Sequence, residues 1–165
     1  GIDTMKVLGA AKKKYNFQIH YPGAGVGGPC LPINSYQLLN TARRAGVKLN
    51  IIESSRQINE RMPEHVIELT LDAFKECNKT IQNNSILILG ISYKPDVKDI
   101  QLTPAKHIIE KLQKLGANVH IYDPYFSSGQ VFGINVEENL DDIISKVDAS
   151  IIVTGHKEFK KIELT

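Results

Sequence analysis

The run Ile86-Leu87-Ile88-Leu89-Gly90-Ile91 constrains the fold of this chain more than any other stretch. A continuous apolar run of this length, without the alternation of a half-exposed strand, is typical of a strand that is buried on both faces. Such strands belong to parallel sheets, in which helices connect the strands and cover both faces. The sequence after this run should therefore alternate between helices and strands.

The residues that follow have this alternation. Thr103 and Pro104 are the residue types of a helix N-cap and a first helical position. We expect a helix from there to about Gly116, strands over 118–122 and 149–154, and a short helix over 140–147. The last strand should be buried like the first. This order predicts a parallel sheet with right-handed crossovers.

Ligands of such sheets bind beyond the carboxyl ends of the strands. In this chain those ends are residues 92–94 (Ser-Tyr-Lys), 123–125 (Asp-Pro-Tyr) and 155–157 (Gly-His-Lys). We therefore expect a binding site among these three segments.

The first half of the chain has a helical pattern instead. Apolar spacing predicts helices over 4–14, over 35–44 with Ser35 as its cap, and over 49–78. Pro63 should bend or interrupt the last of these. That helix is apolar on more than one side, which indicates burial against a second subunit or, alternatively, burial wholly within one domain.

These patterns predict an α/β fold with two parts. A helical central segment over residues 1–82 should be followed by a Rossmann-like parallel sheet with flanking helices over residues 83–165. The polar residues around 82–85 mark the boundary.

Residues 21–34 (Tyr-Pro-Gly-Ala-Gly-Val-Gly-Gly-Pro-Cys-Leu-Pro-Ile-Asn) are rich in glycine and proline and contain Cys30. A thiol in a stiff glycine-rich loop suits a nucleophile beside a bound anion. The alternative is a turn-rich connector with a buried, inert cysteine. The glycines also satisfy the dinucleotide pattern G-x-G-x-x-G. Pro32 argues against that interpretation, because a helix should open at the third glycine.

Composition excludes several classes of function. The net charge is +2 with no basic run, which argues against nucleic-acid binding. No apolar stretch approaches the roughly 20 residues that span a bilayer, and we expect no signal peptide. Cys30 and Cys77 are too few for a disulfide framework, so we expect reduced thiols, a cytoplasmic location and Cys77 in a core. The scattered histidines predict no structural metal.

Four motifs resemble those of the UDP-glucose/GDP-mannose dehydrogenase family, in the same order. They are residues 25–32 (Gly-Val-Gly-Gly-Pro-Cys-Leu-Pro), 90–99 (Gly-Ile-Ser-Tyr-Lys-Pro-Asp-Val-Lys-Asp), 121–125 (Ile-Tyr-Asp-Pro-Tyr) and 148–159. The resemblance covers the family's central and C-terminal nucleotide-sugar domains, without a counterpart of its NAD-binding domain. Ile33 stands where UDP-glucose enzymes tend to carry lysine. This favours the branch that acts on UDP-N-acetylhexosamines such as UDP-N-acetylmannosamine or UDP-N-acetylglucosamine.

The resemblance implies an NAD-dependent oxidoreductase of polysaccharide biosynthesis. It would oxidise the C6 alcohol of a UDP-sugar to the carboxylate in two steps, through a thiohemiacetal and a thioester on Cys30. Nearby backbone N–H groups and cations would favour the thiolate. Independently of the resemblance, the apolar breadth of the helix over 49–78 predicts a homodimer through this helix. NAD would be bound mainly by the domain that this sequence lacks, so we expect the isolated chain to be inactive.

The resemblance assigns roles to individual residues. The implied catalytic residues are Cys30 and Asn34, and the implied cofactor contacts are Pro29 and Gln101. The implied substrate-binding residues are Tyr21, Gly25, Gly27, Gly28, Tyr93 and Lys94. The alternative for Lys94 is a solvated side chain before a proline turn.

Three positions depart from the family pattern. Asn34 and Gln101 stand where the family usually has aspartate and arginine, and Lys98 also replaces an aspartate. Asparagine cannot take up a proton at neutral pH, so thioester hydrolysis would need another base. These departures leave open a second function, that of a non-catalytic, dimeric nucleotide-sugar-binding module.

Overall fold

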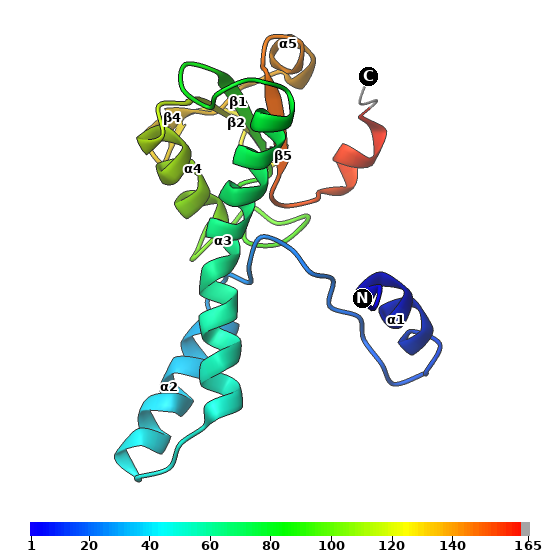
Figure 1. Ribbon diagram of the computed structural model, residues 1–165, viewed down its shortest axis with the longest axis vertical. Helices are drawn as coiled ribbons and strands as arrows, with labels where there is room; N and C mark the ends of the chain where they lie inside the picture. Colours follow the sequence, from blue (N-terminus) through cyan, green and yellow to red (C-terminus); the bar gives the residue numbers. More distant parts are fainter. Residues whose placement is uncertain (163–165) are drawn as a thin grey trace.

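The computed structural model describes residues 1–162. Its longest element is α3 (Asn50–Glu76), which runs along the long axis of the molecule (Figure 1). Helix α2 (Leu31–Arg44) lies beside the N-terminal half of α3, and a small α/β sheet lies at the other end. Helix α1 (Thr4–Ala11) stands apart from both (Figure 1), and none of its residues is buried.

Helix α2 begins earlier than the sequence predicted. It starts at Leu31 rather than at Ser35, and Pro32 lies in its first turn. The missing N–H of a proline has no consequence there, because the first N–H groups of a helix have no intrahelical partner. The Ser35 hydroxyl does not cap the helix but donates back to the carbonyls of Leu31 and Pro32.

Helix α3 is continuous across Pro63, so the expected interruption does not occur. Its two halves have different surroundings. Ile67 and Phe74, in the C-terminal half, are buried in the same cluster as the sheet residues Ile86 and Ile88. The N-terminal half instead exposes Ile51 (83%) and Ile58 (65%).

The sheet confirms the predicted parallel topology. Strand β1 (Ser85–Leu89) lies in the centre, and β2 (Asn118–Tyr122) and β5 (Ala149–Ile152) pair with it in parallel on either side, giving the order β2-β1-β5. Thr103 caps α4 (Pro104–Lys114) by accepting a hydrogen bond from the Ala105 N–H, as predicted. The other elements are α5 (Leu140–Ile144) and the 3-10 helix η1 (Lys157–Lys161).

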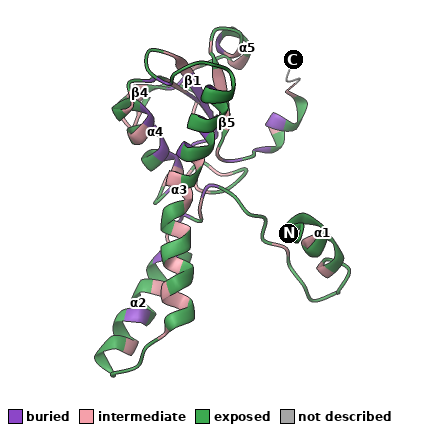
Figure 2. Cartoon of the chain, in the orientation of Figure 1, coloured by how far each residue is buried: buried purple, intermediate pink, exposed green. Residues whose placement is uncertain are grey.

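Two features of the sheet region differ from the prediction. A two-stranded antiparallel hairpin of β3 (Gln130–Val131) and β4 (Ile134–Asn135) follows β2 and was not predicted. Strand β5 is not buried like β1, because it forms an edge of the sheet and its Ile152 is 49% exposed. Buried residues therefore concentrate on β1 and on α4 (Figure 2).

The predicted division at residues 82 and 83 falls in the turn between α3 and β1. It remains a prediction, and Ile67 and Phe74 of α3, which precede this division, belong to the same core as the strand residues that follow it. Over residues 1–162, no helix combines the length and the apolar character that crossing a membrane requires.

Candidate functional site

Cys30 is exposed and occupies the N-cap position of α2. No side chain caps this helix. The Asn34 N–H donates to the Cys30 carbonyl at 2.9 Å, which places Asn34 one turn further along, on the face of the helix that carries the cysteine. The N-terminus of an α-helix favours negative charge, so an anion that forms at the Cys30 sulfur lies in a favourable field.

Residues 23–30, here called the cysteine loop, are held against the segment that follows β1. The Gly28 N–H donates to the Gln101 carbonyl at 2.9 Å. A Cβ on Gly27 would lie 2.3 Å from the Leu102 carbonyl oxygen, and one on Gly28 would lie 2.6 Å from the Tyr93 ring. Gly28 also has a φ of 86°. Both positions therefore require glycine, because the backbone makes direct contact there.

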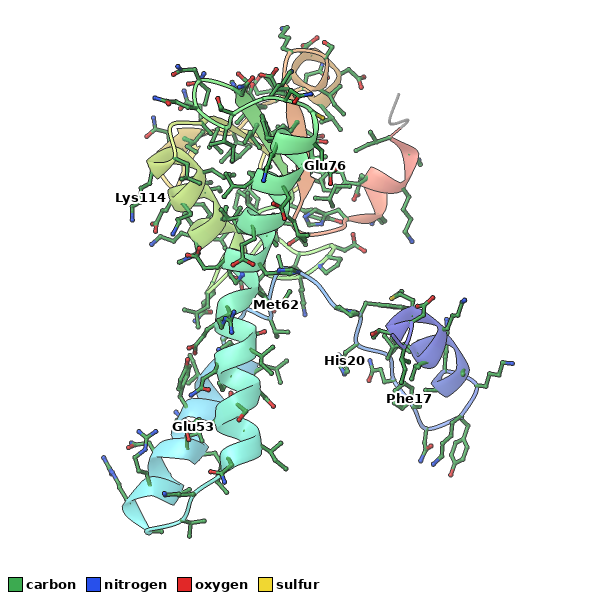
Figure 3. The ribbon with its side chains drawn as sticks, viewed as in Figure 1. Phe17, His20, Glu53, Met62, Glu76 and Lys114 are labelled. Carbon is green, nitrogen blue, oxygen red and sulfur yellow. The ribbon has the colours of Figure 1, made fainter. Side chains whose placement is uncertain are left out.

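Asn59 on α3 holds the other side of the cysteine loop. Its side-chain oxygen accepts from the Val26 N–H at 2.7 Å, and its side-chain amide donates to the Val26 carbonyl at 3.2 Å. Pro63 has no N–H to offer the Asn59 carbonyl, and Gly25 packs against that oxygen instead. Met62, labelled in Figure 3, lies where the loop crosses α3. A Cβ added to Gly25 would lie 3.7 Å from the Met62 Cβ.

Residues 92–99, here called the lysine loop, carry Tyr93 and Lys94. The Tyr93 ring contacts Gly28 of the cysteine loop. Lys94 is exposed, and its ammonium lies 5.5 Å from the centroid of the Tyr93 ring. Tyr93 therefore lies between the cysteine loop and the Lys94 ammonium.

The carboxyl ends of the three strands converge on one buried carboxylate, that of Asp123. Its Oδ2 accepts from the N–H groups of Ile91 and Ser92, from the Ser92 hydroxyl and from His156 Nε2, at 2.9–3.1 Å. Its Oδ1 accepts from the Tyr125 N–H. The sequence predicted that these segments meet, but it did not single out Asp123 and His156. The signal for Asp123 was there, since this acidic residue directly follows β2.

Charged and phenolic groups surround this network at the surface. The Asp96 carboxylate accepts from the Lys157 N–H at 3.2 Å and from the Tyr125 hydroxyl at 3.4 Å. Desolvation, with a further contribution from Asp96, raises the pKa of the Tyr125 phenol. Tyr125, Glu158 and Asp96 together raise the pKa of the Lys157 ammonium, Tyr125 most strongly.

The remaining predicted residues are placed less tightly. Tyr21 is 61% exposed and lies in the segment that leads from α1 to the cysteine loop. Phe17 and His20, which precede it in this segment, lie far from the sheet (Figure 3). Pro29 is half-buried, and Gln101 is exposed and uses its backbone to hold Gly28. Cys77, predicted to lie in a core, is exposed and lines an apolar groove of about 440 Å³ between α3 and β5.

Comparison with known families matches both halves of the chain to neighbouring domains of one family. Residues 1–61 match the central domain of the UDP-glucose/GDP-mannose dehydrogenase family, and residues 87–165 match its UDP binding domain. The chain belongs to this family. The cysteine loop lies in the first match and the lysine loop in the second.

Individual family members match the chain along nearly its whole length. UDP-N-acetyl-D-mannosamine dehydrogenase of Pyrococcus horikoshii is 32% identical over 98% of the chain, and UDP-N-acetyl-D-glucosamine 6-dehydrogenase of Salmonella typhi is also 32% identical over 98%. The solved structure of UDP-D-ManNAc dehydrogenase from P. horikoshii superposes with a TM-score of 0.84 at 31% identity. That of an NDP-N-acetyl-D-galactosaminuronic acid dehydrogenase from Methanosarcina mazei superposes with a TM-score of 0.86 at 26% identity.

The chain spans only part of these relatives. It covers 36% of the P. horikoshii enzyme and 38% of the S. typhi enzyme. The corresponding share of the two solved chains is 37% and 36%.

Proposed function

We propose that this chain provides the cysteine and the UDP-sugar-binding half of an NAD-dependent UDP-sugar 6-dehydrogenase. One observation supports this most: Gly28 of the cysteine loop packs on Tyr93, so that an exposed thiol and the exposed ammonium of Lys94 belong to one assembly. The names of the P. horikoshii and S. typhi relatives favour a UDP-N-acetylhexosamine as substrate.

Cys30 would hold the sugar between two oxidation steps. Its sulfur adds to the C6 aldehyde while the aldehyde oxygen takes up a proton, giving a thiohemiacetal. Loss of hydride and a proton from that adduct leaves a thioester. Water then attacks the thioester carbon, the carbon–sulfur bond breaks, and the carboxylate leaves while the thiol is restored. NAD, when bound, accepts the hydride in each of the two oxidations.

Asn34 would orient the water or the adduct rather than remove a proton, because an amide is not a base at neutral pH. Gly25, Gly27 and Gly28 would let the substrate approach the backbone of the loop. Lys94 would meet a phosphate oxygen as a compact cation, with Tyr93 beside it and Tyr21 at the edge of the site.

The glycine pattern of the cysteine loop does not fit a dinucleotide site. The pattern binds pyrophosphate when it links a strand to a helix, but residues 15–22 form no strand and Gly27 and Gly28 are already packed on Leu102 and Tyr93. Within the described residues, only Pro29 and Gln101 remain as proposed NAD contacts, at the rim of the site. Most of the NAD site would therefore belong to a further domain, and we expect no NADH from this chain alone.

The exposed apolar residues of α3 support the proposal of a homodimer. Ile51 and Ile58 are seven residues apart and therefore lie on one face of the helix, and Leu69 is also more than half exposed. Sedimentation equilibrium should show a dimer at micromolar concentration. A monomer at that concentration would contradict the proposed interface.

The proposed activity can be tested in a chimera, in which this chain replaces the matching residues of the P. horikoshii relative. With UDP-N-acetylmannosamine and NAD, the chimera should release two NADH for each uronic acid formed. Absence of the uronic acid, in a chimera that still binds UDP, would overturn the proposal and favour the second candidate. That candidate is a non-catalytic nucleotide-sugar-binding module, which Asn34 and Gln101 favour because they replace the usual aspartate and arginine.

A further inference from the structure

The lysine loop is fixed at two points, and the proposed binding residues lie between them. At its start, the Ser92 N–H and hydroxyl donate to the Asp123 carboxylate. Four residues later, the Asp96 N–H donates to His156 Nδ1 at 2.9 Å. Tyr93 and Lys94 stand between these attachment points, so their positions depend on both.

We propose that His156 is a positioning residue of the UDP site: its buried imidazole fixes the lysine loop and thereby orients Tyr93 and Lys94. This inference rests on the proposed function for its ligand, and on the hydrogen bonds of His156 for its mechanism. His156 is not a catalytic residue in this proposal, since it acts only through the loop.

The hydrogen bonds define the state of the imidazole. Nδ1 accepts from the Asp96 N–H and therefore carries no proton, while Nε2 donates to Asp123 Oδ2 at 3.0 Å. The ring is neutral, with its proton on Nε2. The side chains of His156 and Asp123 are both fully buried. A buried carboxylate is costly unless its oxygens are satisfied, and His156 is one of the donors that satisfy Asp123 Oδ2.

Packing alone does not explain a histidine at this position. Its ring lies 5.4 Å from the Phe159 ring, edge-on, and 5.0 Å from the Tyr125 ring, and an apolar side chain would suit such neighbours. Few side chains can donate at one end and accept at the other, as His156 does. These two hydrogen bonds connect the lysine loop to the residues that follow β2 and β5, which are far apart in the sequence.

The conformation of Asp96 shows how closely the loop is held. Asp96 has a φ of 60°, which non-glycine residues adopt rarely. The bond to His156 uses its N–H, and its carboxylate is turned outward to the Lys157 N–H and the Tyr125 hydroxyl. Without the His156 acceptor, the Asp96 N–H would lose its partner and the strained turn would lose a support.

The test compares three variants of this chain by calorimetric titration with UDP and by thermal unfolding. His156→Phe removes both hydrogen bonds, and His156→Gln keeps a donor and an acceptor. His120→Phe is the matched control, because His120 lies on β2 and is paired with Glu137 at 2.9 Å, away from the strand ends. We expect His156→Phe to weaken UDP binding about tenfold, which corresponds to roughly 1.4 kcal/mol. His156→Gln should retain most of the affinity, and His120→Phe all of it.

Other results would overturn the inference. If folded His156→Phe binds UDP with the affinity of the unmodified chain but has a lower melting temperature, His156 contributes only to stability. Equal weakening in His156→Phe and His156→Gln would show that its hydrogen bonds do not matter.

A measurement that needs no ligand separates this inference from the proposed function. NMR of the unmodified chain should show a proton on His156 Nε2 and a coupling across the hydrogen bond between the Asp96 nitrogen and Nδ1. Because this measurement uses the unmodified chain, it tests the inference even if His156→Phe does not fold. A proton on Nδ1 would overturn the positioning role. If that coupling is present but UDP does not bind, the proposed function fails while the lysine loop is still held as inferred.

Discussion

The cysteine loop and the lysine loop lie in contact but are stabilised by different means. The cysteine loop is held through its own backbone: Gly27 and Gly28 pack on neighbouring backbone and on a ring, and the backbone of Val26 bonds to the Asn59 side chain. Buried polar side chains, Asp123 and His156, hold the lysine loop. The difference follows from what each loop presents. The proposed nucleophile would need open space around its side chain, which a loop fixed through its main chain allows, whereas the proposed binding cation can lie on a loop that is fixed from the core beneath it.

The largest expected effect concerns the cysteine itself. In the chimera, Cys30→Ser should reduce uronic acid formation by roughly a thousandfold or more, because the adduct with the aldehyde cannot form. Cys77→Ser is the matched control, since this thiol is also exposed but lies on the sheet side of α3. The measurement is uronic acid released per mole of enzyme. Full activity in Cys30→Ser would remove the thiol from the mechanism.

A smaller loss should follow from crowding the backbone of the cysteine loop. In Gly27→Ala, the added methyl group would meet the Leu102 carbonyl oxygen, so the loop must move and activity should fall roughly tenfold to a hundredfold. Gly23→Ala provides the comparison, because a Cβ there has no atom within 4 Å. Initial rates of the two chimeras decide the matter. Similar rates would mean that the contact with Leu102 does not set the position of Cys30.

The side-chain contact of the same loop should matter less. Asn59→Ala removes both hydrogen bonds to Val26, and each is worth about 0.5–1.5 kcal/mol. We expect a lower free energy of unfolding in denaturant titration and a several-fold slower chimera. Asn59→Asp keeps the acceptor for the Val26 N–H, so its stability and rate should lie between those of Asn59→Ala and the unmodified protein. An unchanged rate in Asn59→Ala would show that the backbone contacts suffice.

The smallest effect concerns a surface pair remote from both loops. Asp148 accepts from the Ser85 N–H and from Lys79, and these contacts lower the pKa of its carboxyl below 3.8. Because the folded pKa is lowered, the stabilisation is complete above the unfolded value and is lost as the pH falls through the folded value. Asp148→Asn should therefore lower the melting temperature slightly at neutral pH and not below the folded pKa. A difference that persists in acid would have another cause.

The sequence predicted the sheet well because its signals are local. The apolar run of β1, the Thr103–Pro104 start of α4 and Asp123 directly after β2 are all visible within a few positions. The predicted start of α2 at Ser35 is wrong, because Pro32 fits into the first turn of the helix, where its missing N–H has no cost. The exposure of β5 and Cys77 depends on which elements lie beside them, which no local pattern contains.

The candidate site divides in the same way. The motifs identified Cys30, Gly27, Gly28 and Tyr93, and the structure brings these positions or their loops into contact. The pairing of Asp123 with His156 joins residues 33 positions apart and depends on the register of three strands. The contact between Asn59 and Val26 depends on the path of the loop across α3, which no local pattern contains.

The most direct measurement is calorimetric titration of this chain with UDP, repeated for Lys94→Ala and for Lys114→Ala. Lys114, labelled in Figure 3, is an exposed lysine at the far end of α4. If the two loops form one nucleotide-sugar site, the unmodified chain and Lys114→Ala should bind UDP alike and Lys94→Ala should bind it about tenfold more weakly. No binding to the unmodified chain, or equal binding to all three, would contradict the site.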